Sequence, residues 1–209
     1  MCGFVGYVND TPDKSVNEKI IKDMADRIRH RGPDQDDYYV DSSVSLGFRR
    51  LSIIDLDGGS QPILNEDGTK VLVFNGEIYN YQPIREELIK KGHVFRTKTD
   101  SEVLLHGYEE YGCELLNKLR GMFAFVIWDS TEKKLFGARD IFGIKPFFYY
   151  LKNGNFLFGS EIKSFLSNPL FEKELNEERL PDYLCFEYIP TTETMFKNVY
   201  KMEPGSYFT

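Results

Sequence analysis

Short apolar runs of strand length recur along the chain, separated by glycine, proline and polar clusters. The first run, GFVGYV at 3–8, contains glycines that would let another backbone or a ligand approach closely. Apolar runs of this length with turn-rich borders are typical of β-strands. We predict strands at 3–8, 37–40, 44–49, 71–75, 122–129, 134–139, 146–151 and 155–160.

A helical spacing of apolar residues follows the first strand. Ser15 and Glu18 form an S-x-x-E pattern, which is typical of a capping box at a helix start. Gly32 and Pro33, in the sequence HRGP, predict where this helix ends. The apolar face of the predicted helix comprises Val16, Ile20, Ile21, Met24, Ala25 and Ile28.

The other helical patterns are clustered and do not alternate strictly with strands. Asp100 is the predicted N-cap of a helix at 101–111. Strands outnumber helices, so this order indicates an α+β protein of packed layers rather than a parallel doubly wound sheet. The remaining helices are predicted at 82–91, 161–167 and 175–185.

Composition narrows the classes of partner. The 209 residues suffice for one substantial core, and the formal net charge of -7 removes the attraction that nucleic acids or anionic membranes require. Small molecules or other proteins are therefore the expected partners. The longest apolar run, at 122–128, is far shorter than the roughly 20 residues needed to cross a bilayer, and no secretory signal is predicted.

Cysteine and histidine spacing predicts neither a disulfide framework nor a metal site. Cys2, Cys113 and Cys185 are widely separated, and a reducing cytoplasm is the expected compartment. The three histidines lack a paired ligand spacing such as H-x-x-x-H. Cys113 and Cys185 fall in helical patterns and are expected to be buried packing residues.

Cys2 directly follows the initiator methionine. Removal of Met1 would leave an α-amine and a thiol on adjacent carbons of one residue. Such an amine has an ordinary pKa of about 7.7–8.0 and can accept the thiol proton, so an N-terminal cysteine carries its own general base. Judged by position alone, Cys2 is equally well an incidental residue near a chain end.

Groups suited to an amino-acid amide substrate occur in three further stretches. Cleaving such an amide requires an oxyanion hole, a cation for the carboxylate and an anion for the ammonium. Arg50, the dipeptide Asn75-Gly76 and Asp100 have this chemistry, but they also fit a surface charge, a turn and a helix cap. The stretches are FRRLSIIDL (48–56), FNGEIYNY (74–81) and RTKTDSEV (96–103).

The motifs of the whole chain resemble one family. They are MCGFVGYV, HRGPD (30–34), RRLSIIDL (49–56), FNGEIYNY, TDSE (99–102), LRGMFAFVIWD (119–129), ARDIFGIKPFFYY (138–150) and FGSEIKSFL (158–166). Together they resemble the class II glutamine amidotransferase domain, and more narrowly the glutaminase half of glutamine-hydrolysing asparagine synthetases. The resemblance implies an N-terminal-nucleophile hydrolase fold, a four-layer αββα sandwich of two stacked, mainly antiparallel sheets flanked by helices.

The resemblance also implies catalytic roles. Cys2 matches the nucleophile that attacks the side-chain amide of L-glutamine and forms a γ-glutamyl thioester, with its own α-amine as general acid and base. Asn75, through its side chain, and Gly76, through its backbone N–H, match the oxyanion hole. The implied products are glutamate and ammonia.

A substrate-binding set is carried over in the same way. Arg50 matches the guanidinium that binds the glutamine carboxylate, and bidentate geometry would make lysine a poor substitute. Asp100 matches the partner of the substrate ammonium, whereas Arg31 lies near the active site with no chemical step assigned. The full implied set is Arg50, Leu51, Ile53, Asn75, Glu77 and Asp100.

The resemblance divides the chain at about residue 190. Residues 2–190 correspond to the glutaminase domain, and 191–209 to a segment leading toward a synthetase domain whose SGGxDS-type loop does not occur here. We therefore expect an excised domain that needs no cofactor and supplies ammonia to an ATP- and Mg²⁺-dependent synthetase domain. Open alternatives are a free-standing relative of the domain, a catalytically idle glutamine-binding or assembly module, and an acceptor other than aspartate. The sequence also leaves a homodimer open.

Overall fold

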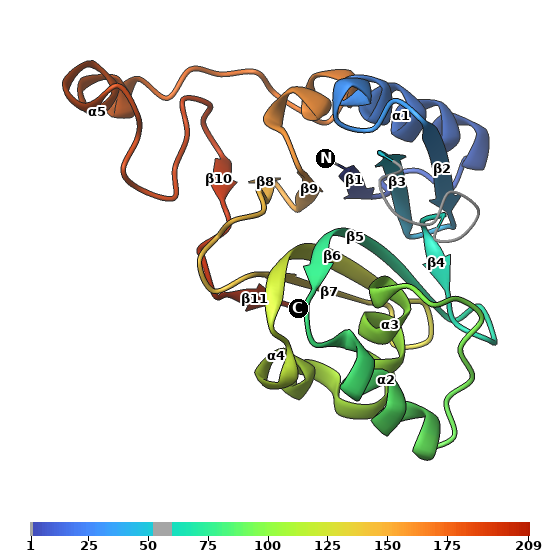
Figure 1. Ribbon diagram of the computed structural model, residues 1–209. Helices are drawn as coiled ribbons and strands as arrows, with labels where there is room; N and C mark the ends of the chain where they lie inside the picture. Colours follow the sequence, from blue (N-terminus) through green and yellow to red (C-terminus); the bar gives the residue numbers. More distant parts are fainter. Residues whose placement is uncertain (1, 52–59) are drawn as a thin grey trace.

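Two antiparallel sheets stack on each other in the computed structural model, which describes residues 2–51 and 60–209 (Figure 1). The first sheet has the order β10 (Val199–Lys201), β8 (Phe148–Lys152), β9 (Asn155–Gly159), β1 (Gly3–Val8), β3 (Val44–Arg50), β2 (Gln35–Val40). The second has the order β11 (Tyr207–Phe208), β7 (Lys134–Arg139), β6 (Gly121–Asp129), β5 (Lys70–Ile78), β4 (Ile63–Leu64).

Helices cover the outer faces of both sheets. Helix α1 (Lys14–Asp26) packs on the first sheet, while α2 (Tyr81–Lys90) and α3 (Asp100–Tyr111) pack on the second. The structure thus has the order helix, sheet, sheet, helix, and the predicted four-layer αββα fold is confirmed. The remaining α-helices are α4 (Leu115–Lys118) and α5 (Leu180–Phe186).

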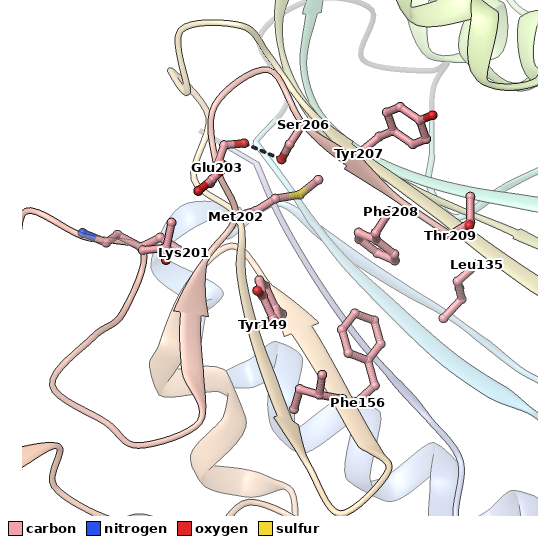
Figure 2. Close-up of a pocket in the computed structure, with 12 residues that line it drawn as sticks. Leu135, Tyr149, Phe156, Lys201, Met202, Glu203, Ser206, Tyr207, Phe208 and Thr209 are labelled. Atoms are coloured by element: carbon pink, nitrogen blue, oxygen red, sulfur yellow. Dashed lines mark hydrogen bonds between the residues drawn. The ribbon is translucent and has the colours of Figure 1, made fainter.

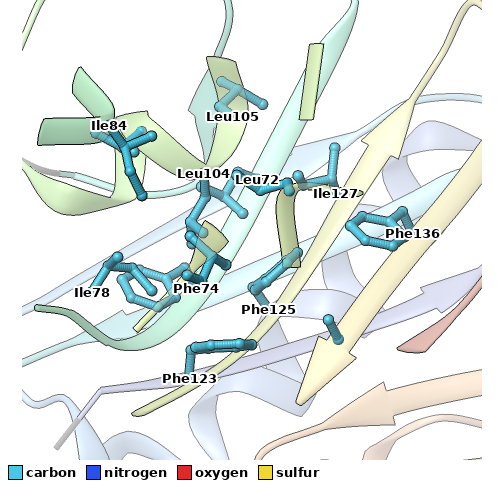
Figure 3. Packing of buried hydrophobic residues seen from close by; sticks show 14 of the residues in the cluster. Leu72, Phe74, Ile78, Ile84, Leu104, Leu105, Phe123, Phe125, Ile127 and Phe136 are labelled. Atoms are coloured by element: carbon cyan, nitrogen blue, oxygen red, sulfur yellow. The ribbon is translucent and has the colours of Figure 1, made fainter. Parts of the chain in front are cut away.

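Strands in the middle of the sandwich are buried on both faces. In β5, Val71 and Val73 belong to the core between the sheets, while Leu72 and Phe74 face the helices of the second sheet. This alternation follows from the two-residue period of a strand. Figure 3 shows the helix-side core, in which Phe123, Phe125 and Ile127 of β6 lie beside residues of α2 and α3.

The start of α1 differs from the prediction. The N-cap is Asp13, whose side chain accepts hydrogen bonds from the backbone N–H of Ser15 and of Val16. The predicted capping box of Ser15 and Glu18 is therefore wrong, because Ser15 already lies inside the helix. The α-helix ends at Asp26, and Gly32 instead ends a following 3-10 helix at Arg29–Arg31.

Two further expectations are corrected. Thr99 is the N-cap of α3, and Asp100 is the first residue of the helix, so Asp100 is not the cap that we predicted. Cys113 and Cys185 are exposed and not buried. Among the described residues, every helix is too short or too polar to cross a bilayer. Residues 191–209 contribute β10 and β11, one to each sheet, and the division near residue 190 stays a prediction.

Candidate active site

One cavity of about 520 Å³ gathers most of the residues that the sequence singles out. Its walls come from the residue before β1, from the end of β3, from the end of β5 and from the start of α3. Ile53 lies outside the described residues. The predicted residues that line the cavity are Cys2, Arg50, Leu51, Gly76, Glu77 and Asp100.

Strand pairing fixes Cys2 at the cavity. Gly3 pairs with Arg49 in the antiparallel β1–β3 ladder, so Cys2 comes opposite Arg50, the last residue of β3. The backbone N–H of Leu51 donates to the Cys2 Sγ at 3.4 Å, which holds the side chain at the cavity. Arg31 Nε donates to the Cys2 carbonyl at 3.0 Å, so the HRGPD loop holds the backbone at Cys2.

The side chains of the two adjacent arginines of β3 lie on different faces of the sheet. Arg49 forms ion pairs with Asp26 and Asp36, on the side of α1 and β2. Arg50 is 7% exposed and lines the cavity, where its Nη1 donates to Gln35 Oε1 at 2.9 Å. The strand period therefore gives Arg50, and not Arg49, access to a bound substrate.

Asn75 does not itself line the cavity but lies in β5 between two residues that do, Phe74 and Gly76. It is 2% exposed, and its Nδ2 has no hydrogen-bond partner among the residues that the structure describes. Leaving a buried amide N–H unpaired costs about 1–3 kcal/mol, so such a group points to a ligand. The adjacent Gly76 lines the cavity, and a Cβ there would lie 2.3 Å from the carbonyl oxygen of Met122, which excludes a side chain.

Asp100 adds a carboxylate to the cavity that Arg50 also lines. Its Oδ2 accepts a hydrogen bond from the backbone N–H of Ile78 at 2.8 Å. Burial raises the pKa of Asp100, and the nearby Glu77 carboxylate raises it further, while the Ile78 hydrogen bond opposes both. A buried cation and a half-buried carboxylate on one cavity suit a zwitterionic amino acid.

The sequence analysis did not single out several residues that line the cavity or support its wall. Glu102 does not line the cavity, but it accepts hydrogen bonds from the backbone N–H of Arg96 and of Thr97, each at 2.7 Å, next to the lining segment. Burial raises the pKa of Glu102, but hydrogen bonds from His106, Arg96 and Thr97 outweigh it and lower this pKa to about 2. Glu102 is the last residue of the TDSE motif, to which the sequence analysis assigned no role beyond that of Asp100. The other lining residues are Gln61, Phe74, Ile78, Tyr79, Tyr81, Lys98, Thr99 and Ser101.

A second cavity, of about 550 Å³, lies among β8, β9, β10 and β11 (Figure 2). Aromatic side chains such as Tyr149 and Phe156 form much of its wall, and the Ser206 hydroxyl donates to the Glu203 carbonyl at its rim. None of the predicted site residues that the structure describes lines this cavity. The candidate active site is therefore the cavity at Cys2.

A comparison with protein families agrees with this geometry. A family model described as a glutamine amidotransferase domain matches residues 1–209. The chain belongs to this family.

Curated relatives of this amidotransferase domain are longer proteins. The chain is 49% identical over 213 residues to asparagine synthetase [glutamine-hydrolyzing] 1 of Bacillus subtilis, covering 100% of the chain and 33% of the relative. It is 43% identical over 214 residues to asparagine synthetase [glutamine-hydrolyzing] 2 of the same organism, covering 99% of the chain and 28% of the relative. The amidotransferase domain therefore spans about a third of the length of these relatives.

A solved structure supports the fold of the amidotransferase domain. The glutamine phosphoribosylpyrophosphate amidotransferase of B. subtilis, complexed with ADP and GMP, matches with a TM-score of 0.66. The match covers 83% of this chain and 45% of that one at 19% identity. At this identity the similarity concerns the arrangement of the sheets and helices.

Proposed function

We propose that this domain hydrolyses L-glutamine to glutamate and ammonia through a thioester on Cys2. One observation carries the proposal. The cavity is lined by Cys2, and Asn75, which lies in β5 between the lining residues Phe74 and Gly76, has a buried amide nitrogen without a described partner. Family membership and the opposite charges of Arg50 and Asp100 support the same substrate.

The proposed chemistry uses groups of this chain alone. Removal of Met1 frees the α-amine of Cys2, which accepts the thiol proton as the sulfur attacks the side-chain carbonyl carbon of glutamine. Asn75 Nδ2 and the Gly76 N–H then stabilise the resulting oxyanion, and each such donor typically contributes about 3 kcal/mol. The ammonium of Cys2 returns its proton to the departing nitrogen, and ammonia leaves. Water then attacks the thioester, which releases glutamate and restores the thiol.

Substrate binding is proposed to use both ends of the amino acid. Arg50 binds the glutamine carboxylate through its guanidinium, whose planar fork matches a carboxylate. Asp100 binds the ammonium, with Glu77 adding negative charge. Leu51 and Ile53 complete the binding set that the resemblance implies.

We further propose that the ammonia serves an asparagine-forming synthetase domain in the intact cytoplasmic protein. The chain spans about a third of its asparagine synthetase relatives, which supports a larger assembly. ATP and Mg²⁺ would be required only in that other domain, and the amidotransferase domain itself needs no cofactor for hydrolysis.

The variant Cys2→Ala tests the proposed reaction. It should bind glutamine in calorimetry and release no ammonia, because the nucleophile is lost while Arg50 and Asp100 remain. Cys113→Ala is the matched control, since Cys113 is an exposed free thiol, and it should retain full turnover. Ammonia release by Cys2→Ala would contradict the proposal. Glutamine binding without turnover by the unmodified domain would instead favour an idle binding module.

A further inference from the structure

Two histidines and a glutamate meet at a place that is separate from the glutamine cavity. His93 lies just after α2, where its backbone N–H donates to the Leu88 carbonyl at 3.1 Å. His106 and Glu109 lie one turn apart on α3, so their side chains share one face of the helix. Ligand atoms of His93, His106 and Glu109 all lie within 4.8 Å of one another.

The inner nitrogen of each histidine faces the same carboxylate oxygen. His106 Nδ1 lies 2.8 Å from Glu109 Oε2, and His93 Nδ1 lies 3.7 Å from that atom. The other Glu109 oxygen accepts a hydrogen bond from Asn65 Nδ2 at 2.6 Å, which fixes the carboxylate. Three potential ligand atoms therefore converge from two separate segments.

The outer nitrogen of each histidine faces a different carboxylate. His106 Nε2 lies 3.7 Å from Glu102 Oε1, and His93 Nε2 lies 3.2 Å from Glu110 Oε2. Histidines that bind metal ions almost always donate their second ring N–H to such a partner, which orients the ring and sets the tautomer. Each outer nitrogen thus faces a carboxylate, at hydrogen-bond distance for His93 and at ion-pair distance for His106.

Glu66 lies outside this group of three, but its carboxylate is close enough to His106 to become a fourth ligand by a side-chain movement. Glu66 Oε2 lies 3.8 Å from His106 Nδ1, while Glu66 Oε1 accepts a hydrogen bond from the backbone N–H of Val94 at 3.3 Å. Tetrahedral zinc, with bonds of about 2.0–2.2 Å, requires ligand atoms roughly 3.3 Å apart. The spacings of 2.8, 3.7 and 3.8 Å lie on both sides of this value.

We propose that His93, His106, Glu109 and Glu66 form a binding site for one Zn²⁺ ion. Two imidazoles favour zinc over Mg²⁺ and Ca²⁺, which prefer oxygen ligands. The excess of carboxylates favours a cation, although Lys91 Nζ, 2.7 Å from Glu110 Oε1, offsets one of them. The sequence predicts no metal site because the two histidines are far apart along the chain. The fold, however, brings their rings to a centroid distance of 5.2 Å.

Four protein ligands would make this site structural, not catalytic. The ion would join the turn that contains Glu66 and the segment that contains His93 to helix α3. The same segment continues to Arg96 and Thr97, which Glu102 holds beside the glutamine cavity. Bound zinc would therefore stabilise the fold by mass action, and the proposal does not depend on glutamine hydrolysis.

Calorimetric titration of the chelator-treated domain with ZnCl₂ tests the site. We expect one Zn²⁺ per chain and a Kd at least about tenfold higher in His93→Gln, since His93 is accessible enough to change without unfolding the domain. His30→Gln is the matched control, because His30 also contacts a carboxylate, that of Glu161 at 2.8 Å, and it should bind zinc normally. Glu109→Gln should weaken binding as His93→Gln does.

Cobalt distinguishes this site from the thiol and amine of Cys2, which could also chelate a metal ion. Co²⁺ bound by histidine and carboxylate should give visible bands without an intense thiolate-to-cobalt charge-transfer band in the near ultraviolet. Such a charge-transfer band, or loss of binding in Cys2→Ala, would overturn the proposal. An absence of saturable Zn²⁺ binding, or binding unchanged in both His93→Gln and Glu109→Gln, would overturn it as well.

Discussion

Asn75 carries a buried amide nitrogen with no hydrogen-bond partner among the described residues, which makes it the sharpest test at the residue scale. We predict that Asn75→Ala lowers kcat about 10²–10³-fold with little change in KM, because the donor acts on the oxyanion of the transition state. Steady-state ammonia release measures both constants.

Asn17 offers the matched control for Asn75. It is fully buried, but its side chain is satisfied by hydrogen bonds with the Tyr7 hydroxyl and the Thr11 carbonyl, each at 2.9 Å. Asn17→Ala should lower the Tm and leave the kcat of the folded domain unchanged. The opposite pattern, with Asn75→Ala losing stability but no activity, would make Asn75 a structural residue.

Asp100 predicts a pH dependence of substrate binding. Burial raises its pKa, so the carboxylate becomes protonated at a higher pH than an ordinary aspartate. The ionised form is the one that would pair with the substrate ammonium. The KM for glutamine should therefore rise as the pH falls through this raised pKa, and Asp100→Asn should abolish that part of the profile.

The raised pKa of Asp100 has the opposite effect on the stability of the unliganded domain, which should decrease as the pH rises. An acid with a raised folded-state pKa contributes fully to stability below its unfolded pKa, and this contribution is lost as the pH rises through the folded value. At pH values above the folded-state pKa of Asp100, the variant Asp100→Asn should thus have a higher Tm than the unmodified domain. A KM for glutamine that is flat across the acidic range would contradict the role of Asp100.

The sequence predicted which side chains matter better than how they are held. The resemblance singled out Cys2, Arg50 and Asp100, which the structure brings to one cavity. The contacts of Leu51 N–H with the Cys2 sulfur and of Ile78 N–H with Asp100 were not predicted. They depend on strand register and on long-range packing, and a local pattern contains neither.

At the scale of elements, the first turn of α1 provides a direct comparison of two caps. Asp13 accepts from two backbone N–H groups, whereas the predicted box used Ser15 and Glu18. We predict that Asp13→Ala lowers the Tm by a few degrees, as loss of an N-cap does. Glu18→Ala is the control and should change the Tm by less. Equal effects in a thermal melt would restore the capping-box interpretation.

Most strands were predictable because their apolar runs are bounded by turn residues, but their order was not. Strands such as β5 and β6 are buried on both faces, so their sequences read as nearly continuous apolar runs and do not show which face meets which sheet. The short strands β4, β10 and β11 have too few residues for a periodic signal.

At the scale of the whole molecule, the residue pattern alone indicated α+β layers, and the family resemblance specified four of them. The same resemblance did not reveal the cluster at His93 and His106, because that cluster forms only when α3 packs beside the segment after α2. The residues that line the cavity were therefore more predictable than the second cluster of polar side chains.

The central claim is that this domain acts through an N-terminal cysteine. The chain contains three cysteines, so a test must identify which of them reacts. Peptide mass spectrometry after treatment with a glutamine-analogue electrophile tests the claim most directly. We predict a single adduct on a peptide that begins with Cys2 and lacks Met1, with labelling suppressed by excess glutamine. A labelled peptide that retains Met1, or an adduct on exposed Cys113 or Cys185 in its place, would contradict the account.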